Sequence, residues 1–249
     1  MCPTDTQASL ARRLLGLIDL TSLNDNDDAA SVAALASLGV CPAGRVAAFC
    51  TWPRFLASAR ESLRGSGVPI AAVSNFPAGS NDASAVAAET AAAIAAGADE
   101  IDVVFPYHAF LAGDRTAGLE VVSACRAACT ANTVLKVILE TGQLRDRQRI
   151  QAAAHLAIEG GAHFLKTSTG KTAPGATLEA AAALIEVIAA ARADGRSVGL
   201  KVSGGVSSMA QAEAYLRLFE QTLGPGSATS ASFRIGTSTL IRPVLAALQ

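Results

Sequence analysis

The sequence predicts an α/β protein with the closed (β/α)₈ architecture of a TIM barrel. Short β-type runs alternate with longer Ala-rich helical runs from one end of the chain to the other. This alternation is typical of parallel strands joined by right-handed helical crossovers. The chain has 249 residues, which matches the length of about 250 residues common for such barrels.

The strand candidates are short apolar segments, as expected for parallel strands that are buried on both faces. They cover residues 14–19, 46–50, 70–75, 99–105, 133–140, 162–166, 197–203 and 232–236. An open doubly wound sheet usually has about five or six strands. Eight strand candidates therefore favour a closed barrel.

Helices are expected between the strands, over residues 27–39, 53–65, 80–96, 115–131, 144–159, 177–194, 207–222 and 239–248. Pro53 and Pro243 suit a first helical turn, and Asp82 and Ser208 suit N-caps. A short extra helix near residues 4–13 is expected over the bottom of the barrel. No Gly/Ser/Pro-rich linker divides the chain, so residues 1–249 are predicted to form one barrel domain.

Composition argues against several classes of partner. The net charge is −1 and the sequence has no basic run, which argues against a nucleic-acid or membrane-surface partner. No apolar run reaches the length of about 18 residues needed to span a bilayer. The five cysteines are odd in number and lack a disulfide-framework spacing. With no secretory h-region, this usage predicts a cytoplasmic protein with reduced thiols.

Lysine is scarce, and its placement is the strongest indication of chemistry. Lys136, Lys166, Lys171 and Lys201 all lie in predicted strands or in the loops that follow them, and the other sixteen basic residues are Arg. Unlike Arg, a buried Lys can lose its proton and become a nucleophile. Active sites of such barrels lie at the carboxyl ends of the strands. The pattern therefore predicts amine chemistry at that end.

Lys166 is the best candidate for an amine that attacks a carbonyl, because it lies between an apolar strand and a Ser/Thr loop. A free Lys, with a pKa of about 10.4, is a poor nucleophile unless burial or a second cation lowers that value. Lys201 is the candidate cation, and Asp102 is placed to move protons. Period-2 spacing pairs Lys136 with Glu140, which predicts a buried ion pair beneath the site.

A phosphate site is indicated by three consecutive strand-end loops. Thr167 to Lys171 follow the sixth strand, Gly204 and Gly205 the seventh, and the segment 236–239 the eighth. Glycine lets backbone N–H groups approach an anion, and loops after strands seven and eight are the usual phosphate site of such barrels. Arg234, within the last strand, is interpreted as a structural ion-pair member.

Seven motifs resemble, in order, those of the deoxyribose-phosphate aldolases, a class I aldolase family, over about residues 15 to 242. They are LIDLTSLN, FCTWPRF, GADEIDVVFPY, LKVILETGQL, FLKTSTGK, LKVSGGV and FRIGTSTL. The resemblance implies a TIM-barrel lyase that needs neither metal nor cofactor. It also implies reversible cleavage of 2-deoxy-D-ribose 5-phosphate to D-glyceraldehyde 3-phosphate and acetaldehyde, in deoxyribonucleoside catabolism. A homodimer is the family expectation.

The resemblance also implies a role for each matching residue. Lys166 would form the Schiff base, and Lys201 and Asp102 would move protons with an ordered water. Asp19, Cys50 and Thr169 match positions near the substrate hydroxyls. The phosphate pocket would be formed by Gly170, Lys171, Gly204, Gly205, Gly236, Ser238 and Thr239.

Two alternatives remain open at this point. The first is another Schiff-base aldolase of the same fold, acting on a different phosphosugar or keto acid. The second is a non-catalytic phosphosugar-binding barrel, in which the lysines would be structural. A zinc-dependent aldolase is disfavoured, because His108, His155 and His163 lack metal-ligand spacing.

Overall fold

The structure is a computed structural model that describes residues 3–249, with side chains from residue 7 onward. Eight parallel strands form a closed barrel, in the spatial order β1, β10, β9, β8, β7, β6, β5, β4. Their bounds are β1 Ile18–Ser22, β4 Ala48–Thr51, β5 Ile70–Ser74, β6 Glu100–Val104, β7 Val134–Ile138, β8 Phe164–Lys166, β9 Gly199–Ser203 and β10 Phe233–Thr237. The predicted (β/α)₈ barrel is therefore confirmed.

The register of the barrel sets charged residues side by side. Asp102 on β6 is the partner of Lys136 on β7, and Lys166 on β8 is the partner of Lys201 on β9. Lys201 in turn lies beside Arg234 on β10. Because neighbouring residues in register point to the same face of a sheet, this pairing brings the charges together inside the barrel.

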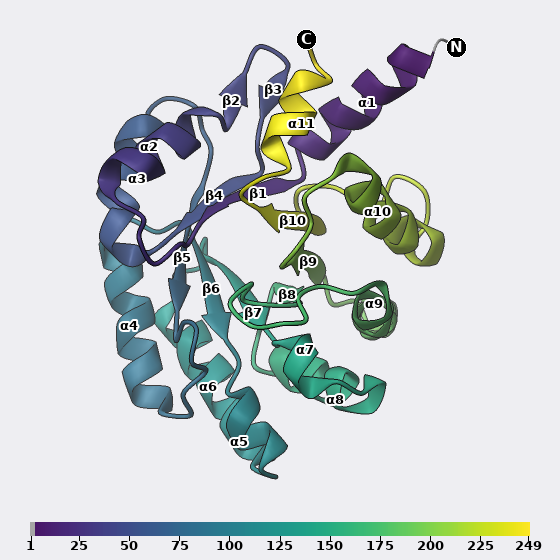
Figure 1. The fold of residues 1–249 in the computed structure, drawn as a ribbon. Coiled ribbons are helices and arrows are strands. Elements are labelled where there is room, and N and C mark those ends of the chain that lie inside the picture. The colour runs from purple at the N-terminus through teal and green to yellow at the C-terminus, as the bar shows by residue number, and fades with distance from the viewer. Residues whose placement is uncertain (1–2) are drawn as a thin grey trace.

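The helices lie outside the ring of strands (Figure 1). They are α1 Pro3–Leu15, α2 Ala29–Ser37, α3 Leu56–Ser62, α4 Ala83–Ala95, α5 Tyr107–Leu111, α6 Arg115–Ala128, α7 Thr141–Leu144, α8 Arg147–Glu159, α9 Leu178–Ala193, α10 Met209–Leu223 and α11 Ile241–Ala246, with a 3₁₀ turn at Pro53–Phe55. Asp82 and Ser208 cap α4 and α10 as predicted, each accepting from a backbone N–H of the first turn.

Three short elements were not predicted, because each is too short to show a periodic pattern. A small hairpin, β2 Val40–Cys41 and β3 Gly44–Arg45, precedes β4. The helix α5 follows β6, and α7 follows β7. The helix expected at residues 144–159 therefore begins at Arg147, after a break at Arg145, which has a φ of +64°.

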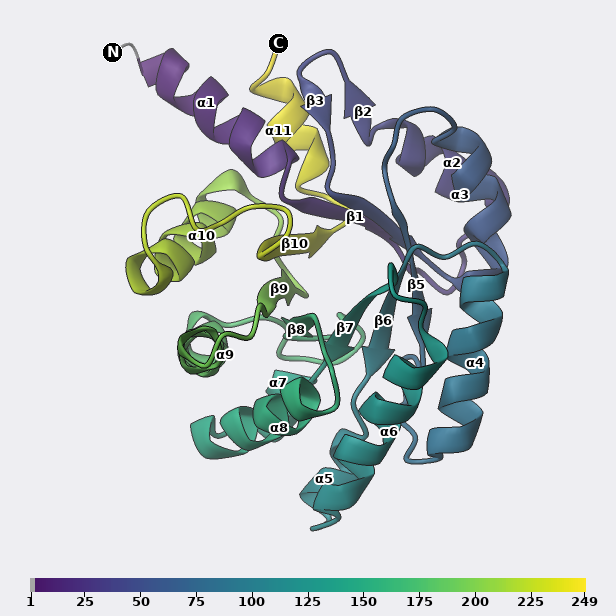
Figure 2. The same ribbon diagram turned by 180° about the vertical axis from the view of Figure 1, so that it is seen from behind.

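The strand predicted at residues 14–19 is wrong in its first half. Leu14 and Leu15 end the helix α1, and β1 begins only at Ile18. Ala11, Leu14 and Leu15 are buried at the i, i+3, i+4 spacing of a helix face. The extra helix expected at residues 4–13 is therefore α1, which extends over Pro3–Leu15. It packs beside α11 in the outer layer rather than across the bottom of the barrel (Figures 1 and 2).

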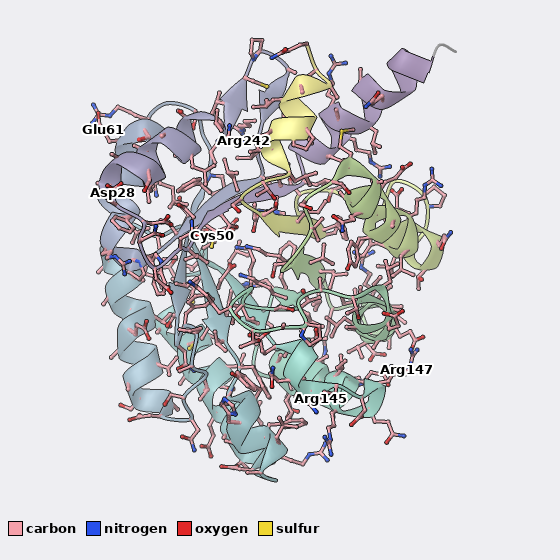
Figure 3. All side chains as sticks on the ribbon, in the orientation of Figure 1. Asp28, Cys50, Glu61, Arg145, Arg147 and Arg242 are labelled. Carbon is pink, nitrogen blue, oxygen red and sulfur yellow. The ribbon has the colours of Figure 1, made fainter. Side chains whose placement is uncertain are left out.

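Side chains divide between the barrel interior and the periphery. Cys50 on β4 lies toward the centre, whereas Glu61 and Arg147 extend from the outer helices (Figure 3). Cys41, Cys50, Cys125 and Cys129 are free thiols, and Cys2 lies outside the described residues. Across residues 3–249, no helix has the length and apolar character needed to cross a bilayer.

Gly118 provides a test of the packing between α6 and the barrel. A Cβ at this position would lie 2.4 Å from Cζ of the buried Phe105 ring. Gly→Ala within a helix usually stabilises by about 1 kcal/mol. Here we expect Gly118→Ala to destabilise by about 1–3 kcal/mol, because the buried ring would have to shift to accommodate the Cβ.

The measurement is urea denaturation, with Gly16→Ala as the control. A Cβ on Gly16 would meet only a backbone oxygen, at 3.8 Å, so we expect a change within about 0.5 kcal/mol. A stabilised Gly118→Ala would contradict the packing described here.

Candidate active site

Asp102 on β6 accepts hydrogen bonds from three lysines. Lys136 Nζ lies 2.8 Å from its Oδ1, and Lys166 Nζ and Lys201 Nζ each lie 2.7 Å from its Oδ2. All four side chains are buried. The structure thus brings together the three predicted catalytic residues, and it adds Lys136 as a third amine.

A second group of charges lies beside the first. Asp19 on β1 forms an ion pair with Lys201, whose Nζ lies 2.6 Å from Oδ2, and its Oδ1 accepts a hydrogen bond from Arg234 Nη1 at 2.6 Å. Glu100 on β6 lies 2.5 Å from Lys136 Nζ and 3.3 Å from Arg234 Nη2. Arg234 is therefore a member of a structural ion pair, as predicted from the sequence.

The seven residues Asp19, Glu100, Asp102, Lys136, Lys166, Lys201 and Arg234 are referred to below as the charged cluster. It contains four basic groups for three carboxylates, so one buried positive charge has no counter-charge within the cluster. A buried charge without a partner costs several kcal/mol. Loss of one proton from an amine would remove this cost.

Lys166 is the amine that the cluster holds least firmly. Lys136 lies within 4 Å of three carboxylates, and Lys201 within 4 Å of two. Lys166 contacts Asp102 alone, through an oxygen that also accepts from Lys201. The contacts therefore favour Lys166 as the group that gives up its proton.

The pKa shifts agree with this order. Burial lowers the pKa of Lys166 below its ordinary 10.5, Asp102 opposes the shift, and the charge of Lys201 adds to it. Burial alone would also lower the pKa of Lys201, but Asp102 and Asp19 outweigh burial and raise it. The pKa of Lys136 is raised by Asp102, Glu100 and Asp19 against the effect of burial.

Burial alone would raise the pKa of Asp102, but Lys136, Lys166 and Lys201 hold it well below its usual range. Cys50 Sγ lies 3.7 Å from Asp102 Oδ2. Burial, together with the negative charge of Asp102, raises the pKa of this thiol to about 11. Asp102 is thus a carboxylate at neutral pH, while Cys50 is a neutral thiol.

The predicted pairing of Lys136 with Glu140 is wrong. The amine of Lys136 contacts Glu100 and Asp102. Glu140 instead accepts hydrogen bonds from Thr169, on the loop after β8. The period-2 prediction fails because β7 ends at Ile138 and Glu140 has a φ of +53°. A left-handed residue breaks the strand alternation on which the prediction depended.

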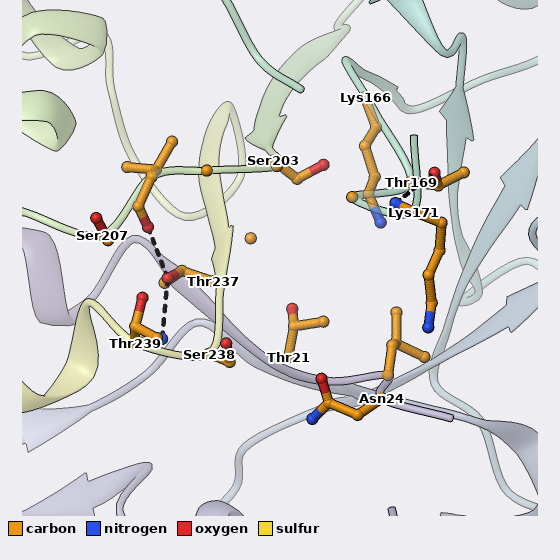
Figure 4. Close-up of a pocket in the computed structure, with 16 residues that line it drawn as sticks. Thr21, Asn24, Lys166, Thr169, Lys171, Ser203, Ser207, Thr237, Ser238 and Thr239 are labelled. Atoms are coloured by element: carbon orange, nitrogen blue, oxygen red, sulfur yellow. Dashed lines mark hydrogen bonds between the residues drawn. The ribbon is translucent and has the colours of Figure 1, made fainter. Parts of the chain in front are cut away.

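Lys166 opens onto a pocket of about 310 Å³ at the carboxyl end of the barrel (Figure 4). The pocket is lined by Thr21, Leu23, Asn24, Lys166, Thr169, Gly170, Lys171, Ser203, Gly204, Gly205, Val206, Ser207, Gly236, Thr237, Ser238 and Thr239. Nine of the thirteen residues predicted for the site are in this lining. Asp19, Cys50, Asp102 and Lys201 have no exposed surface and belong to the layer around the charged cluster.

Much of the remaining pocket wall, referred to below as the anion-binding wall, is built from loops rich in backbone donors. The N–H groups of Gly170, Gly204, Gly205 and Ser238 take part in none of the hydrogen bonds found within residues 3–249. Gly204 and Gly205 each have a φ of +93°, which a residue with a side chain rarely adopts. Free N–H groups that line a pocket are suited to an anion such as phosphate.

Two predicted site residues have further roles. A Cβ on Gly236 would lie 3.0 Å from Lys201 Cε and 2.9 Å from Ser203 Cβ, so the glycine also leaves room for Lys201. Lys171 Nζ is 2.6 Å from Asp25 Oδ1, on the loop after β1. This lysine therefore joins two loops at the rim of the pocket.

Thr21, Asn24 and Ser207 line the pocket but were not among the residues proposed from the sequence, whereas Thr237 belongs to the predicted phosphate loop. Thr237 Oγ1 accepts from the N–H groups of Thr239 and Leu240 and donates to Val206 O, so it fixes the last loop (Figure 4). Thr21 and Asn24 lie at and just beyond the end of β1. A polar Thr or Asn at a strand end was the available signal for these two.

No group of three or more His, Cys, Asp and Glu side chains is arranged to hold a metal ion in the described part of the chain. The chemistry available from the described residues is that of a buried amine, an adjacent carboxylate–lysine pair and an anion-binding wall.

The charged cluster predicts a stability difference between two substitutions that each remove one amine. Lys136→Met deprives Glu100 of its closest cation, and breaking a buried pair costs about 3–5 kcal/mol. Lys166→Met removes only the ion pair with Asp102 Oδ2, an oxygen that Lys201 also contacts. We therefore expect the free energy of unfolding to change by less than about 1 kcal/mol. Urea denaturation of both variants at neutral pH measures the difference, and equal destabilisation would contradict this account.

Residues 13–228 match the DeoC/LacD family aldolase. A structure provisionally identified as deoxyribose-phosphate aldolase from Toxoplasma gondii ME49 is similar at 26% identity and a TM-score of 0.89, over 99% of this chain and 96% of that one. Another from Coccidioides immitis, also provisionally identified, has 26% identity and a TM-score of 0.81, over 95% and 86%.

Deoxyribose phosphate aldolase from Aeropyrum pernix, described as a tetramer, has 25% identity and a TM-score of 0.73, over 96% of this chain and 91% of that one. The family match covers most of the chain, and these structures share the barrel over nearly its whole length. The chain belongs to the DeoC/LacD aldolase family.

Proposed function

We propose that this chain is a class I aldolase that reversibly cleaves 2-deoxy-D-ribose 5-phosphate to D-glyceraldehyde 3-phosphate and acetaldehyde. The observation that carries the proposal is the position of Lys166. Its amine belongs to a cluster with surplus positive charge, and it opens onto a pocket lined by free N–H donors. An amine with a lowered pKa and an anion site in the same pocket suit a phosphorylated aldehyde.

In the synthetic direction, Lys166 Nζ attacks the carbonyl carbon of acetaldehyde, and the carbinolamine takes up a proton and loses water to form a protonated imine. A proton then leaves the methyl group and passes through a water molecule to the Asp102–Lys201 pair, which leaves an enamine. Because Lys201 Nζ is 2.7 Å from Asp102 Oδ2, the two groups can exchange that proton directly.

The enamine carbon attacks the aldehyde carbon of D-glyceraldehyde 3-phosphate, and the aldehyde oxygen takes up a proton to become a hydroxyl group. Hydrolysis of the resulting imine releases the sugar phosphate and restores the amine of Lys166. Cleavage follows the same steps in reverse. When the enamine forms, the positive charge of the protonated imine is neutralised. The Asp102–Lys201 pair holds the proton until the aldehyde oxygen takes one up.

The phosphate group would be bound by the N–H groups of Gly170, Gly204, Gly205 and Ser238, with Lys171, Gly236 and Thr239 in the same wall. Binding energy gained there would position the aldehyde carbon against the enamine. Thr169 would contact a substrate hydroxyl. Asp19 and Cys50 would support Lys201 and Asp102 from the layer below.

Action in deoxyribonucleoside catabolism, a cytoplasmic location and assembly as a homodimer complete the proposal. The similarity to structures named deoxyribose-phosphate aldolase supports the first of these. Light scattering would test the homodimer.

Reductive trapping tests the Schiff base. Borohydride added with acetaldehyde should leave a stable ethyl group on Lys166, found by peptide mapping, and Lys166→Arg should not be labelled there. Dihydroxyacetone and pyruvate serve as alternative donors, and only acetaldehyde should give efficient trapping. A label located on another lysine, or none at all, would refute the assignment.

The pH dependence of trapping tests the role of Lys201. Because only the neutral amine attacks, the rate should rise with pH and reach its midpoint below 10.5, the ordinary pKa of lysine. Lys201→Met removes the cation that lowers the pKa of Lys166, so the midpoint should move to higher pH. A midpoint that is unchanged or lower in this variant would show that Lys201 does not act on Lys166.

A further inference from the structure

Glu140 is a buried carboxylate outside the charged cluster. Its side chain has no exposed surface, and none of the ion pairs among the described side chains includes it. It begins the short helix α7 in a left-handed conformation, with φ +53° and ψ +57°. This backbone turns the side chain away from Lys136 and toward the loop after β8.

The carboxylate of Glu140 accepts hydrogen bonds from both the backbone N–H and the hydroxyl group of Thr169. The backbone N–H of Thr169 lies 3.3 Å from each carboxylate oxygen of Glu140. The Thr169 hydroxyl donates to Oε2 of the same carboxylate. Thr169 Oγ1 in turn accepts from the backbone N–H of Lys171 at 3.0 Å.

These contacts determine which hydrogen bonds Thr169 can offer to a ligand. A hydroxyl group has one proton to donate and two lone pairs that accept. The proton is used on Glu140, and one lone pair is used by Lys171. Thr169 lines the pocket, so its hydroxyl would offer a ligand a single acceptor position.

Thr169 lies in the pocket near Lys166 and Lys171 (Figure 4). Lys166 marks the carbon that would form the imine, and the loop beginning at Gly170 belongs to the anion-binding wall. Because Thr169 lies between Lys166 and Gly170 in the chain and lines the same pocket, a ligand that reaches from the amine to this wall would pass Thr169 with its middle carbons. In D-glyceraldehyde 3-phosphate, the carbon between carbonyl and phosphate carries a hydroxyl at C2.

We propose that Glu140 is a specificity-determining positioning residue. By holding Thr169 Oγ1 as an acceptor, it makes the site select aldehydes whose C2 substituent donates a hydrogen bond. The inference rests on the proposed function, because it requires addition to a phosphorylated hydroxyaldehyde. It goes further in naming Glu140 as the residue that sets the polarity of the contact between Thr169 and the substrate hydroxyl.

The test compares three acceptors for enzyme-catalysed addition of acetaldehyde. They share the aldehyde and the phosphate, and they carry hydroxyl, fluorine or hydrogen at C2. Fluorine accepts but does not donate, so opposite an acceptor oxygen it gains nothing. We expect kcat/KM for the hydroxyl acceptor to exceed that for the hydrogen analogue by at least about tenfold.

Glu140→Gln should reverse the polarity of the contact. The Gln carbonyl can accept the Thr169 N–H while its NH₂ group donates to Thr169 Oγ1, which frees the Thr169 O–H to donate to the ligand. The ratio of kcat/KM for hydroxyl over fluorine should then fall at least about tenfold relative to the original chain. Comparing ratios between variants cancels the intrinsic reactivity of each aldehyde.

Two further variants complete the experiment. Glu186→Gln replaces a half-exposed carboxylate on α9 that pairs with Arg147, and it should leave the ratio unchanged. Thr169→Val removes the hydroxyl but keeps the shape. It should abolish the preference for hydroxyl over hydrogen, and it tests the proposal even if Glu140→Gln does not fold.

The outcomes separate this inference from the proposed function. No product from acetaldehyde and D-glyceraldehyde 3-phosphate with the original chain would overturn both. Normal product formation with an unchanged ratio in folded Glu140→Gln, or an unchanged preference in Thr169→Val, would overturn the role of Glu140 alone. Borohydride labelling of Lys166 should remain intact in all three variants.

Discussion

The site depends on an imbalance of charge inside the barrel. Three lysines and an arginine share three carboxylates in a region closed to solvent, and Asp102 alone accepts from three of the amines. Buried charges must be compensated, so the surplus is removed most easily by loss of a proton. Lys166 has the fewest carboxylate contacts and is also the amine that borders the pocket. Electrostatics and access therefore select the same residue.

The barrel creates this imbalance through its register. Lys166 beside Lys201, and Lys201 beside Arg234, are in-register neighbours on consecutive parallel strands, which forces like charges together. The carboxylates of Asp19 on β1 and of Glu100 and Asp102 on β6 partly compensate the repulsion between these positive charges. Gly236 opposite Asp19 leaves the space through which Lys201 passes. The strands thus fix the charges rigidly, while the loops above them supply the donors for an anion.

Much of this was predictable from the sequence, because strand–helix alternation and the polar residues at strand ends are local patterns. They predict the closed barrel and bring Lys166, Lys201 and Asp102 to one end of it. The pairing of Lys136 was not predictable, because it depends on the left-handed backbone at Glu140 and on the register between β6 and β7. The roles of Thr237 and Glu140 depend on hydrogen bonds between loops, which leave no periodic pattern in a sequence.

The central claim is that Lys166 is the amine that loses its proton first. With only four lysines in the chain, ¹⁵N-lysine NMR can follow each Nζ through a pH titration, with single Lys→Arg variants for assignment. The account predicts that Lys166 loses its proton below pH 10.5, while Lys136 and Lys201 retain theirs to higher pH. Loss of the proton from Lys201 or Lys136 before Lys166 would contradict it.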